Sequence, residues 1–430
     1  MNLSSRVLSR LMKHQIDTLP LGEELTLPFY DGLSLVNIPS TIAQLLDAPG
    51  FGKPPIDTEI LQALGGPYEK IILLLVDAMG FHLFQAMMDQ EKDLVWRRYL
   101  DRAVFSPLTS VCPSTTASAL TSLWTGEAPI AHGIIGYEMW AKEFGMVINN
   151  IHQSAASARH DTGGLSRSGF EPHEFLDVPL LGPHLLENGV FPTTFIHSRI
   201  AHSGLSVMQM VDVDVQAYIN ESDLFISLSD YVNSRNGKRD YIYTYYSDID
   251  TLMHQYNEDD ERIRLQFRAF SSIFEEAFLN RLSDKVARDT LLILMADHGS
   301  KKTPIYEHFD LINHPDLTDC LVMQPTCEHR LPILFIKPGR IDFVKDYFAA
   351  TWPEDFVLID PEKAIEDGLF GKGPFRENVR ERLGDLIVVP RTDSYLWGSS
   401  KPNNMAGRHG GLSREEMLVP FYALPLRELF

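Results

Sequence analysis

Two runs of six consecutive apolar residues place the strongest constraint on the fold of this chain. Residues 71–76 read Ile-Ile-Leu-Leu-Leu-Val, and residues 291–296 read Leu-Leu-Ile-Leu-Met-Ala. Strands that are apolar at every position are buried on both faces, as in a parallel sheet that helices cover. Further strands are predicted at 190–196, 240–246, 331–336 and 385–389, and helices at 81–89, 178–187, 260–282 and 342–349. This alternation predicts an α/β fold with a doubly wound, mostly parallel sheet and helices on both faces.

The chain of 430 residues is long for one ordinary core. We expect residues 1–69 to form an N-terminal arm with helices packed on the core, and residues 70–430 to form the main domain. Two stretches, near 137–175 and 340–400, fit the alternation poorly. We interpret both as insertions or cap elements close to the functional site.

The bulk composition restricts the class of partner. A formal net charge of −20 argues against a nucleic-acid polymer, because phosphate backbones need a basic face. The negative charge does not exclude a small phosphate ester as substrate, since bound cations reverse the local field.

No apolar run reaches the length of a membrane span, and the N-terminus carries no signal-peptide pattern. The odd, low count of three cysteines is typical of reduced thiols and predicts a cytoplasmic protein. The oligomeric state is left open.

Metal-type ligands follow both apolar runs directly. Asp77 comes after the first run, and Asp297, His298 and Gly299 come after the second. In open α/β sheets the carboxyl ends of the strands point at the ligand crevice, where a carboxylate or an imidazole is well placed to hold a cation. We expect the glycine to permit a sharp exit from the strand. Helix-capping aspartates and a loop histidine are the alternative interpretations.

Three further candidate ligands lie on a predicted helix and in a glycine-rich turn. Asp250 and His254 are four residues apart, so that they share one face of a helix. A local ion pair is the alternative for them. His409 lies between Gly407 and Gly410, which let the backbone come close and the imidazole point inward. A flexible polar loop is the alternative for His409.

The segment 109–118, Thr-Ser-Val-Cys-Pro-Ser-Thr-Thr-Ala-Ser, concentrates hydroxyl groups ahead of a predicted helix. Backbone N–H groups and the positive end of the helix dipole meet at such a position and favour phosphate or an alkoxide. A nearby divalent cation lowers the pKa of a hydroxyl further and makes it a nucleophile. Ordinary helix capping is the alternative interpretation.

The order of these motifs resembles the alkaline phosphatase superfamily, and within it most closely the nucleotide pyrophosphatase/phosphodiesterase family. The first motif is a lone Asp, and the second is a Thr that precedes a helix ending in Thr-Gly. Asp-x-x-x-His, Asp-His-Gly and His-Gly-Gly follow in that order. Together the motifs span about residues 70–420. In that family the nucleophile lies ten residues before the glycine of Thr-Gly. With Gly126 in that place, the resemblance selects Thr116 over the other hydroxyls of the segment. His132, which lies just beyond, is interpreted as structural.

The resemblance implies a catalytic domain over residues 70–430 with two divalent metal ions and one nucleophile. One metal would be held by Asp77, Thr116, Asp297 and His298, and the other by Asp250, His254 and His409. The mixed nitrogen and oxygen ligands suit zinc, with manganese as the alternative. Thr116 would attack phosphorus as an alkoxide and form a phospho-threonine, which water then hydrolyses. The resemblance thus predicts a metal-dependent phosphodiesterase or nucleotide pyrophosphatase that acts on a small phosphate ester or a nucleotide-like substrate.

Two departures from related patterns bear on this prediction. Nucleotide hydrolases of the family often carry Asn three residues after the nucleophile, where this chain has Ala119. The substrate is therefore expected to differ from a typical nucleotide. Sulfatases of the superfamily modify a cysteine at the nucleophile position, but Cys112 lies four residues too early and no arginine follows it locally. A sulfatase is not expected.

Other functions remain alternatives. The same site can serve a phosphomonoesterase or a metal-dependent phosphomutase, which needs basic residues such as Arg159, Arg167 and Arg199 for a doubly charged phosphate. A non-catalytic binding protein on this fold is the second alternative, although all seven expected ligands are present. We expect the loops 137–175 and 197–205 to shape the pocket, with His197, Arg199 and His202 as candidate lining residues. A surface or packing role is the alternative for each of the three.

Overall fold

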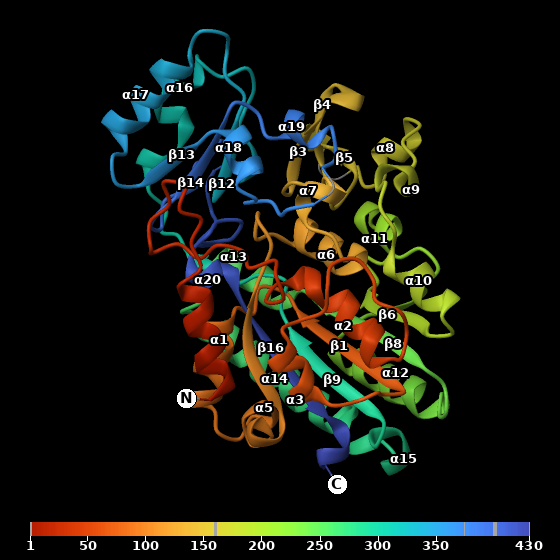
Figure 1. Ribbon diagram of the computed structural model, residues 1–430. Coiled ribbons are helices and arrows are strands. Elements are labelled where there is room, and N and C mark those ends of the chain that lie inside the picture. The colour runs from red at the N-terminus through yellow and green to blue at the C-terminus, as the bar shows by residue number, and fades with distance from the viewer. Residues whose placement is uncertain (1, 159–160, 374, 399–401, 430) are drawn as a thin grey trace.

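The apolar runs form central strands of a seven-stranded sheet in the computed structural model, which describes residues 2–158, 161–373, 375–398 and 402–429 (Figure 1). The strand order is β2-β16-β9-β1-β8-β6-β7. In chain order these strands are β1 Lys70–Val76, β2 Val104–Thr109, β6 Phe191–His197, β7 Asp214–Tyr218, β8 Asp240–Tyr246, β9 Thr290–Met295 and β16 Leu418–Pro425. Five neighbours, β9, β1, β8, β6 and β7, are paired in parallel, whereas β16 runs antiparallel to β2 and β9. The predicted α/β fold with a mostly parallel sheet is confirmed.

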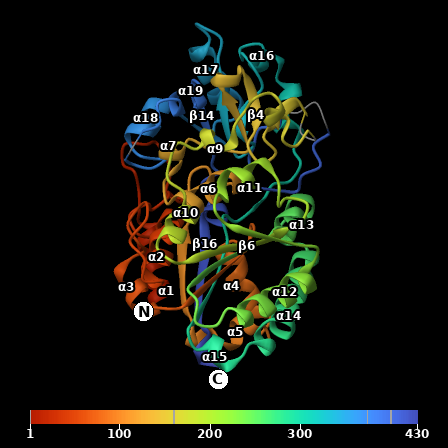
Figure 2. The same ribbon diagram turned by 90° about the vertical axis from the view of Figure 1, so that its right-hand side faces the viewer.

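Helices cover both faces of this sheet, as Figure 2 shows. The longer ones are α1 Leu3–Met12, α2 Ile38–Leu45, α3 Thr58–Leu64, α4 Phe81–Gln90, α6 Thr116–Thr125, α10 Leu181–Glu187, α11 Gly204–Gln209, α12 Glu221–Ser234, α13 Asp248–Tyr256, α14 Glu261–Ala277, α17 Ile341–Thr351 and α18 Pro361–Glu366. Strand β8 shows how both layers attach. Tyr243 meets Trp124 of α6 with ring centroids 5.3 Å apart, while Tyr246 meets Phe270 of α14 at 4.5 Å. Because alternate side chains of a strand point to opposite faces, α6 and α14 lie on opposite sides of the sheet.

A second sheet of seven short strands lies beside the carboxyl end of the first, at the top of Figure 1. Its order is β13-β14-β12-β11-β3-β4-β5, and each of its described pairings is antiparallel. The strands are β3 Glu138–Ala141, β4 Met146–Asn149, β5 Ser154–Ala155, β11 Thr326–Glu328, β12 Leu331–Leu334, β13 Phe356–Ile359 and β14 Leu386–Pro390. The two stretches that fitted the alternation poorly thus contribute strands to one shared sheet.

Two predicted strands belong to this second sheet and not to the parallel one. The segments at 331–336 and 385–389 form β12 and β14, which pair antiparallel with each other. A short apolar strand is buried in either kind of sheet, so periodicity alone does not separate the two cases.

The single-turn helices are α5 Val95–Arg98, α7 Pro129–His132, α8 Gly164–Arg167, α9 Pro172–Phe175, α15 Asp284–Ala287, α16 Pro315–Thr318, α19 Val379–Arg382 and α20 Arg414–Met417. A two-stranded ribbon joins β10 Lys301–Lys302 to β15 Gly407–Arg408.

The N-terminal segment packs against the main core. Val7 and Leu11 of α1 are buried in the same apolar cluster as β1, and α1 contacts β2. The domain boundary predicted at residue 69 stays a prediction.

The three cysteines are buried and form no disulfide. Among the described residues, no helix combines the length and the apolar character that crossing a bilayer requires.

Candidate active site

Three neighbouring parallel strands deliver carboxylates to one edge of the central sheet. In the register of β9, β1 and β8, Leu75 lies between Met295 and Tyr245. The chain then leaves β1 at Asp77 and β9 at Asp297, which are therefore side by side. Helix α13 begins two residues after β8 and carries Asp250 in its first turn. The carboxyl ends of parallel strands meet at the same edge, which explains why ligands far apart in sequence converge there.

Thr116 is the first residue of α6, and its hydroxyl faces this edge. It lies 3.1 Å from Nε2 of His298 and lines the pocket. The other hydroxyls of the segment donate to groups elsewhere: Thr109 to the Leu33 carbonyl, Ser110 to the Asp297 carbonyl, Ser114 to the Gly411 carbonyl, Thr115 to Glu328 and Ser118 to the Ile134 carbonyl. Among these hydroxyls, Thr116 is thus the one directed at the cluster of carboxylates and imidazoles.

Three histidines present Nε2 to the same space. In each of them Nδ1 lies near a backbone carbonyl: His254 at 3.1 Å from Gly407, His298 at 2.9 Å from Gly299 and His409 at 3.3 Å from Ser114. A carbonyl only accepts, so each Nδ1 carries a proton, and Nε2 is the nitrogen of each ring that can present a lone pair to a metal ion. This is the arrangement in which outer hydrogen bonds orient metal-binding imidazoles.

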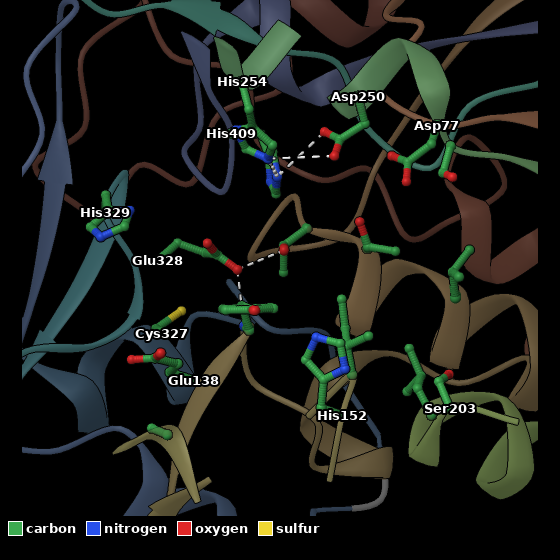
Figure 3. Close-up of a pocket in the computed structure, with 18 of the residues that line it drawn as sticks. Asp77, Glu138, His152, Ser203, Asp250, His254, Cys327, Glu328, His329 and His409 are labelled. Atoms are coloured by element: carbon green, nitrogen blue, oxygen red, sulfur yellow. Dashed lines mark hydrogen bonds and ion pairs between the residues drawn. The ribbon is translucent and has the colours of Figure 1, made fainter. Parts of the chain in front are cut away.

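The ligand atoms form two groups that overlap at His298. Figure 3 shows Asp77 of one group and Asp250, His254 and His409 of the other. Nε2 of His298 lies 3.4 Å from Oδ1 of Asp77 and 3.5 Å from Oδ2 of Asp297. Nε2 of His254 lies 3.4 Å from Oδ2 of Asp250 and 3.3 Å from Nε2 of His409. The rings of His298 and His409 stack with centroids 3.9 Å apart, so the atoms of Asp250, His298 and His409 also converge. The structure brings together all seven predicted ligands, while their division between two ions stays a prediction.

The donor set fits divalent cations. Asp77 Oδ1, Asp250 Oδ1 and Asp297 Oδ2 are buried and accept no hydrogen bond from the described residues. Burial, followed by the charges of Asp297 and Asp250, raises the pKa of Asp77 well above its usual value. Burial, together with the neighbouring His298 and His254, holds the pKa of His409 well below its usual range. Crowded carboxylates repel one another, and burial disfavours a charge on His409, so cations between these groups relieve both effects.

At two glycines of the ligand motifs, Gly299 and Gly410, neighbouring atoms leave no space for a side chain. A Cβ on Gly299 would lie 1.9 Å from the Glu415 carbonyl oxygen, and its φ is not positive. The expected reason for this glycine, a sharp exit from the strand, is therefore wrong, because close backbone approach is what excludes a side chain. A Cβ on Gly410, next to His409, would lie 2.5 Å from Cβ of Glu328, and φ there is 108°.

Two residues of the site were not predicted from the sequence. Tyr245 of β8 donates a hydrogen bond from its hydroxyl to Asp77 Oδ2. Glu328, at the end of β11, accepts hydrogen bonds at Oε1 from the Thr115 hydroxyl at 2.6 Å and from the Tyr137 N–H at 2.9 Å. Burial raises the pKa of Glu328 to about 8. The alternation of tyrosines in β8 was a usable signal for Tyr245, whereas nothing in the sequence marks Glu328.

A cavity of about 920 Å³ extends from these residues between the two sheets. The loops expected to shape it do so: Ile151 and His152 line it from the first loop, and Ile200 and Ser203 from the second. His197, Arg199 and His202 are not among its lining residues. His197 lies 3.0 Å from the Ile219 carbonyl instead.

The basic residues suggested for a doubly charged phosphate are not found in this cavity. Arg167 is exposed and pairs with Asp161, while Arg159 lies outside the described residues. No lysine or arginine occurs among the described residues that line the cavity. Ala119 and Cys112 are buried and are not among the residues that line the cavity.

Comparisons with known proteins agree with this geometry. The family model for type I phosphodiesterase/nucleotide pyrophosphatase matches residues 71–412. Among solved structures, murine ectonucleotide pyrophosphatase/phosphodiesterase 5 is similar with a TM-score of 0.59 and 15% identity, over 83% of this chain and 88% of that chain. An inactive form of the murine protein was solved in complex with AMP. Phosphonoacetate hydrolase from Sinorhizobium meliloti 1021, in complex with phosphonoformate, has a TM-score of 0.57 and 17% identity, over 82% and 89% of the two chains. The comparison with curated protein sequences found no match.

Proposed function

Since the chain belongs to the type I phosphodiesterase/nucleotide pyrophosphatase family, we propose that it is a metal-dependent phosphodiesterase with Thr116 as nucleophile. The chain is a hydrolase of phosphoric ester or anhydride bonds. The observation that carries the proposal is the position of the Thr116 hydroxyl, 3.1 Å from His298 Nε2 at the start of α6. The predicted cytoplasmic location stays a prediction.

Two divalent metal ions, zinc by our proposal and manganese as the alternative, would occupy the two ligand groups. Asp77, Thr116, Asp297 and His298 would hold one ion, and Asp250, His254 and His409 the other. When bound, such ions lower the pKa of a hydroxyl and compensate charge on phosphoryl oxygens. The orphaned carboxylate oxygens, and the 3.3 Å approach of His254 Nε2 to His409 Nε2, support this assignment.

The residues of the chain suit an in-line displacement. The Thr116 oxygen forms a bond to phosphorus after its proton is lost to solvent in the cavity, and the bond from phosphorus to the leaving oxygen breaks. The leaving oxygen departs as an alcohol after it gains a proton. Water then attacks the phosphorus of this phospho-threonine ester, the bond from phosphorus to the Thr116 oxygen breaks, and that oxygen regains a proton. The product released is the phosphate monoester that carries the second alcohol. The N–H groups of the first turn of α6, which have no acceptor within the helix, would be available to the incoming phosphoryl oxygens.

A diester is the preferred substrate class. A diester carries one negative charge on phosphorus, whereas a monoester carries about two at neutral pH. The absence of lysine and arginine from the described cavity lining disfavours the doubly charged group. This observation also weighs against a phosphomutase.

The test compares a chromogenic phosphodiester, methyl 4-nitrophenyl phosphate, with 4-nitrophenyl phosphate. The protein is stripped with chelator and reloaded with zinc or manganese. We expect metal-dependent cleavage of the diester that Thr116→Ala lowers at least 1,000-fold, because the nucleophile is lost (roughly 4 kcal/mol of barrier). Thr116→Ser, which keeps the hydroxyl, is the matched control and should retain part of the activity.

Each other outcome selects another function. Preference for the monoester keeps the site but moves the function to a phosphomonoesterase or a mutase. Full activity in Thr116→Ala contradicts the assigned nucleophile. No turnover of either ester, with two metal ions bound, indicates an enzyme with a narrow substrate or a non-catalytic binding protein on this fold.

A further inference from the structure

The cavity is larger than the reacting phosphoryl group requires, and its extension is apolar. A volume of about 920 Å³ lies at the upper end of the range for small-molecule sites. We call one side of it the apolar arm, which is defined by Leu120, Ile151, Ile196, Ile200, Leu205 and Met210. Four of these side chains are almost fully buried, and Ile151 and Ile200 are half-buried.

The apolar arm begins next to the nucleophile. Leu120 lies one helical turn after Thr116 on α6, so both residues are on the same face of the helix. Helix α11 closes the other side, where Gln209 donates to the Thr121 hydroxyl at 2.7 Å. The N–H of Leu205 in turn donates to the Ile151 carbonyl at 3.1 Å. Figure 3 shows Ser203 and His152 across the open space from Asp77 and Asp250.

The polar side chains of α11 that line this region are engaged within the protein. The hydroxyls of Ser203 and Ser206 lie 3.0 Å apart, and Ser206 donates to the Ile200 carbonyl at 2.8 Å. Gln209 is held by Thr121. Tyr243 and Thr326 also line the cavity and keep a buried hydroxyl without a partner among the described residues, but α11 offers no free donor or acceptor to a nucleobase. An aliphatic group needs none.

We propose that the apolar arm binds an aliphatic substituent of the phosphodiester, so that the substrate is an ester of a fatty or otherwise long-chain alcohol. This inference rests on the proposed function, which places the phosphoryl group at Thr116. Burial of each methylene contributes about 0.8 kcal/mol, which corresponds to about fourfold in affinity per CH₂ until the arm is filled.

The test uses methyl n-alkyl phosphates with chains from methyl to octyl. Their binding to zinc-loaded Thr116→Ala is measured by calorimetry, which needs no turnover. The same compounds are used as competitors of methyl 4-nitrophenyl phosphate hydrolysis by the wild-type protein. We expect the dissociation constant to fall about fourfold per methylene over the first several carbons.

A pair of charge-matched variants locates the effect. Ile200→Asp places a carboxylate in the apolar arm, while Val207→Asp places one on the outer face of α11, where Val207 is 38% exposed. Both variants add the same charge close to the cavity. We expect the chain-length dependence to flatten in Ile200→Asp and to persist in Val207→Asp.

The outcomes separate this inference from the proposed function. Hydrolysis of methyl 4-nitrophenyl phosphate with no chain-length dependence overturns the apolar arm and leaves the phosphodiesterase standing. Tighter binding of a nucleoside monophosphate methyl ester than of the octyl ester overturns it as well. Failure to hydrolyse the chromogenic diester, with chain-length dependence retained, supports the apolar arm and counts against the enzyme.

Discussion

Tyr245 donates a hydrogen bond to the carboxylate of Asp77 from the neighbouring strand. Strands β8 and β1 pair so that Tyr245 lies opposite Leu75, and the N–H of Asp77 donates to the Tyr246 carbonyl at 2.9 Å. One carboxylate oxygen of Asp77 is thus fixed by Tyr245, and the other is left facing His298. Tyr245 is a positioning residue, because it orients a proposed metal ligand without being one.

Replacing Tyr245 by Phe should weaken zinc binding about 10–100-fold, the range typical of lost outer hydrogen bonds to metal ligands. Tyr243→Phe is the matched control, because the Tyr243 hydroxyl lies in the same strand and cavity but makes no hydrogen bond to the described residues. The measurement is a competitive zinc titration against a chromophoric chelator. Equal losses in the two variants would show that the Tyr245 hydrogen bond has no role in metal binding.

Glu328 should make the stability of the metal-free protein depend on pH. Burial raises its pKa from 4.5 to about 8, so the folded protein holds the proton more tightly than the unfolded chain does. The stabilisation is fully present below pH 4.5 and is lost as the pH rises toward 8. Glu328→Gln keeps an acceptor for Thr115 and Tyr137 but does not titrate. We expect the fall in Tm between pH 5 and pH 8 to be smaller by a few degrees in the variant, as measured by calorimetry with chelator present. An unchanged fall would contradict the assignment.

The loop that carries His409 is anchored by a buried ion pair. Arg330 and Glu416 are fully buried, with Arg330 Nη2 at 2.7 Å from Glu416 Oε2. Glu416 also accepts hydrogen bonds from the N–H groups of Gly411 and Ser413, just after His409. Glu416→Gln leaves the Arg330 cation buried without a counter-charge, so the free energy of unfolding should fall by about 3–5 kcal/mol.

The control for this prediction is an ion pair at the surface. Arg380 pairs with Glu362, whose side chain is 60% exposed. Glu362→Gln should change the free energy of unfolding by less than about 1 kcal/mol, because water screens the pair. Urea denaturation measures both variants. A loss in Glu416→Gln as small as that in the surface variant would mean that the buried pair does not stabilise the loop.

The parallel half of the fold and the ligand cluster could be predicted from the sequence because both follow from one rule. Strands apolar at every position, such as β1 and β9, are recognisable, and their carboxyl ends locate Asp77 and Asp297. The second sheet could not be predicted, because its strands are short and join segments nearly two hundred residues apart. The pairing of β11 with β3 rests on the single pair of Cys327 with Glu138.

The parts of the site that were missed depend on contacts between distant segments. Tyr245 is one of several tyrosines in β8, and only the direction of its side chain distinguishes it from Tyr246, which points to the opposite face. Glu328 gains its place from Thr115 and Tyr137, neither of which is near it in sequence. The apolar arm likewise forms where α6, β6 and α11 meet. From the sequence alone, each apolar residue on these elements is predicted to belong to the hydrophobic core.

Gly299 offers a test of how tightly the Asp297-His298 turn is fitted. Its Cβ position lies 1.9 Å from the Glu415 carbonyl oxygen, a backbone atom that cannot rotate away. Gly299→Ala should therefore displace the Asp297-His298 turn from the end of β9, lower the free energy of unfolding by about 1–3 kcal/mol and weaken zinc binding.

Gly50→Ala is the control, because the nearest atom to its Cβ position is the Ser40 hydroxyl at 3.3 Å, which a small movement accommodates. Zinc titration and urea denaturation are run on both variants. Because Asp297 and His298 directly precede the clash, zinc affinity should fall in Gly299→Ala and not in Gly50→Ala. Unchanged zinc affinity in Gly299→Ala would show that the ligands hold their geometry independently of the turn.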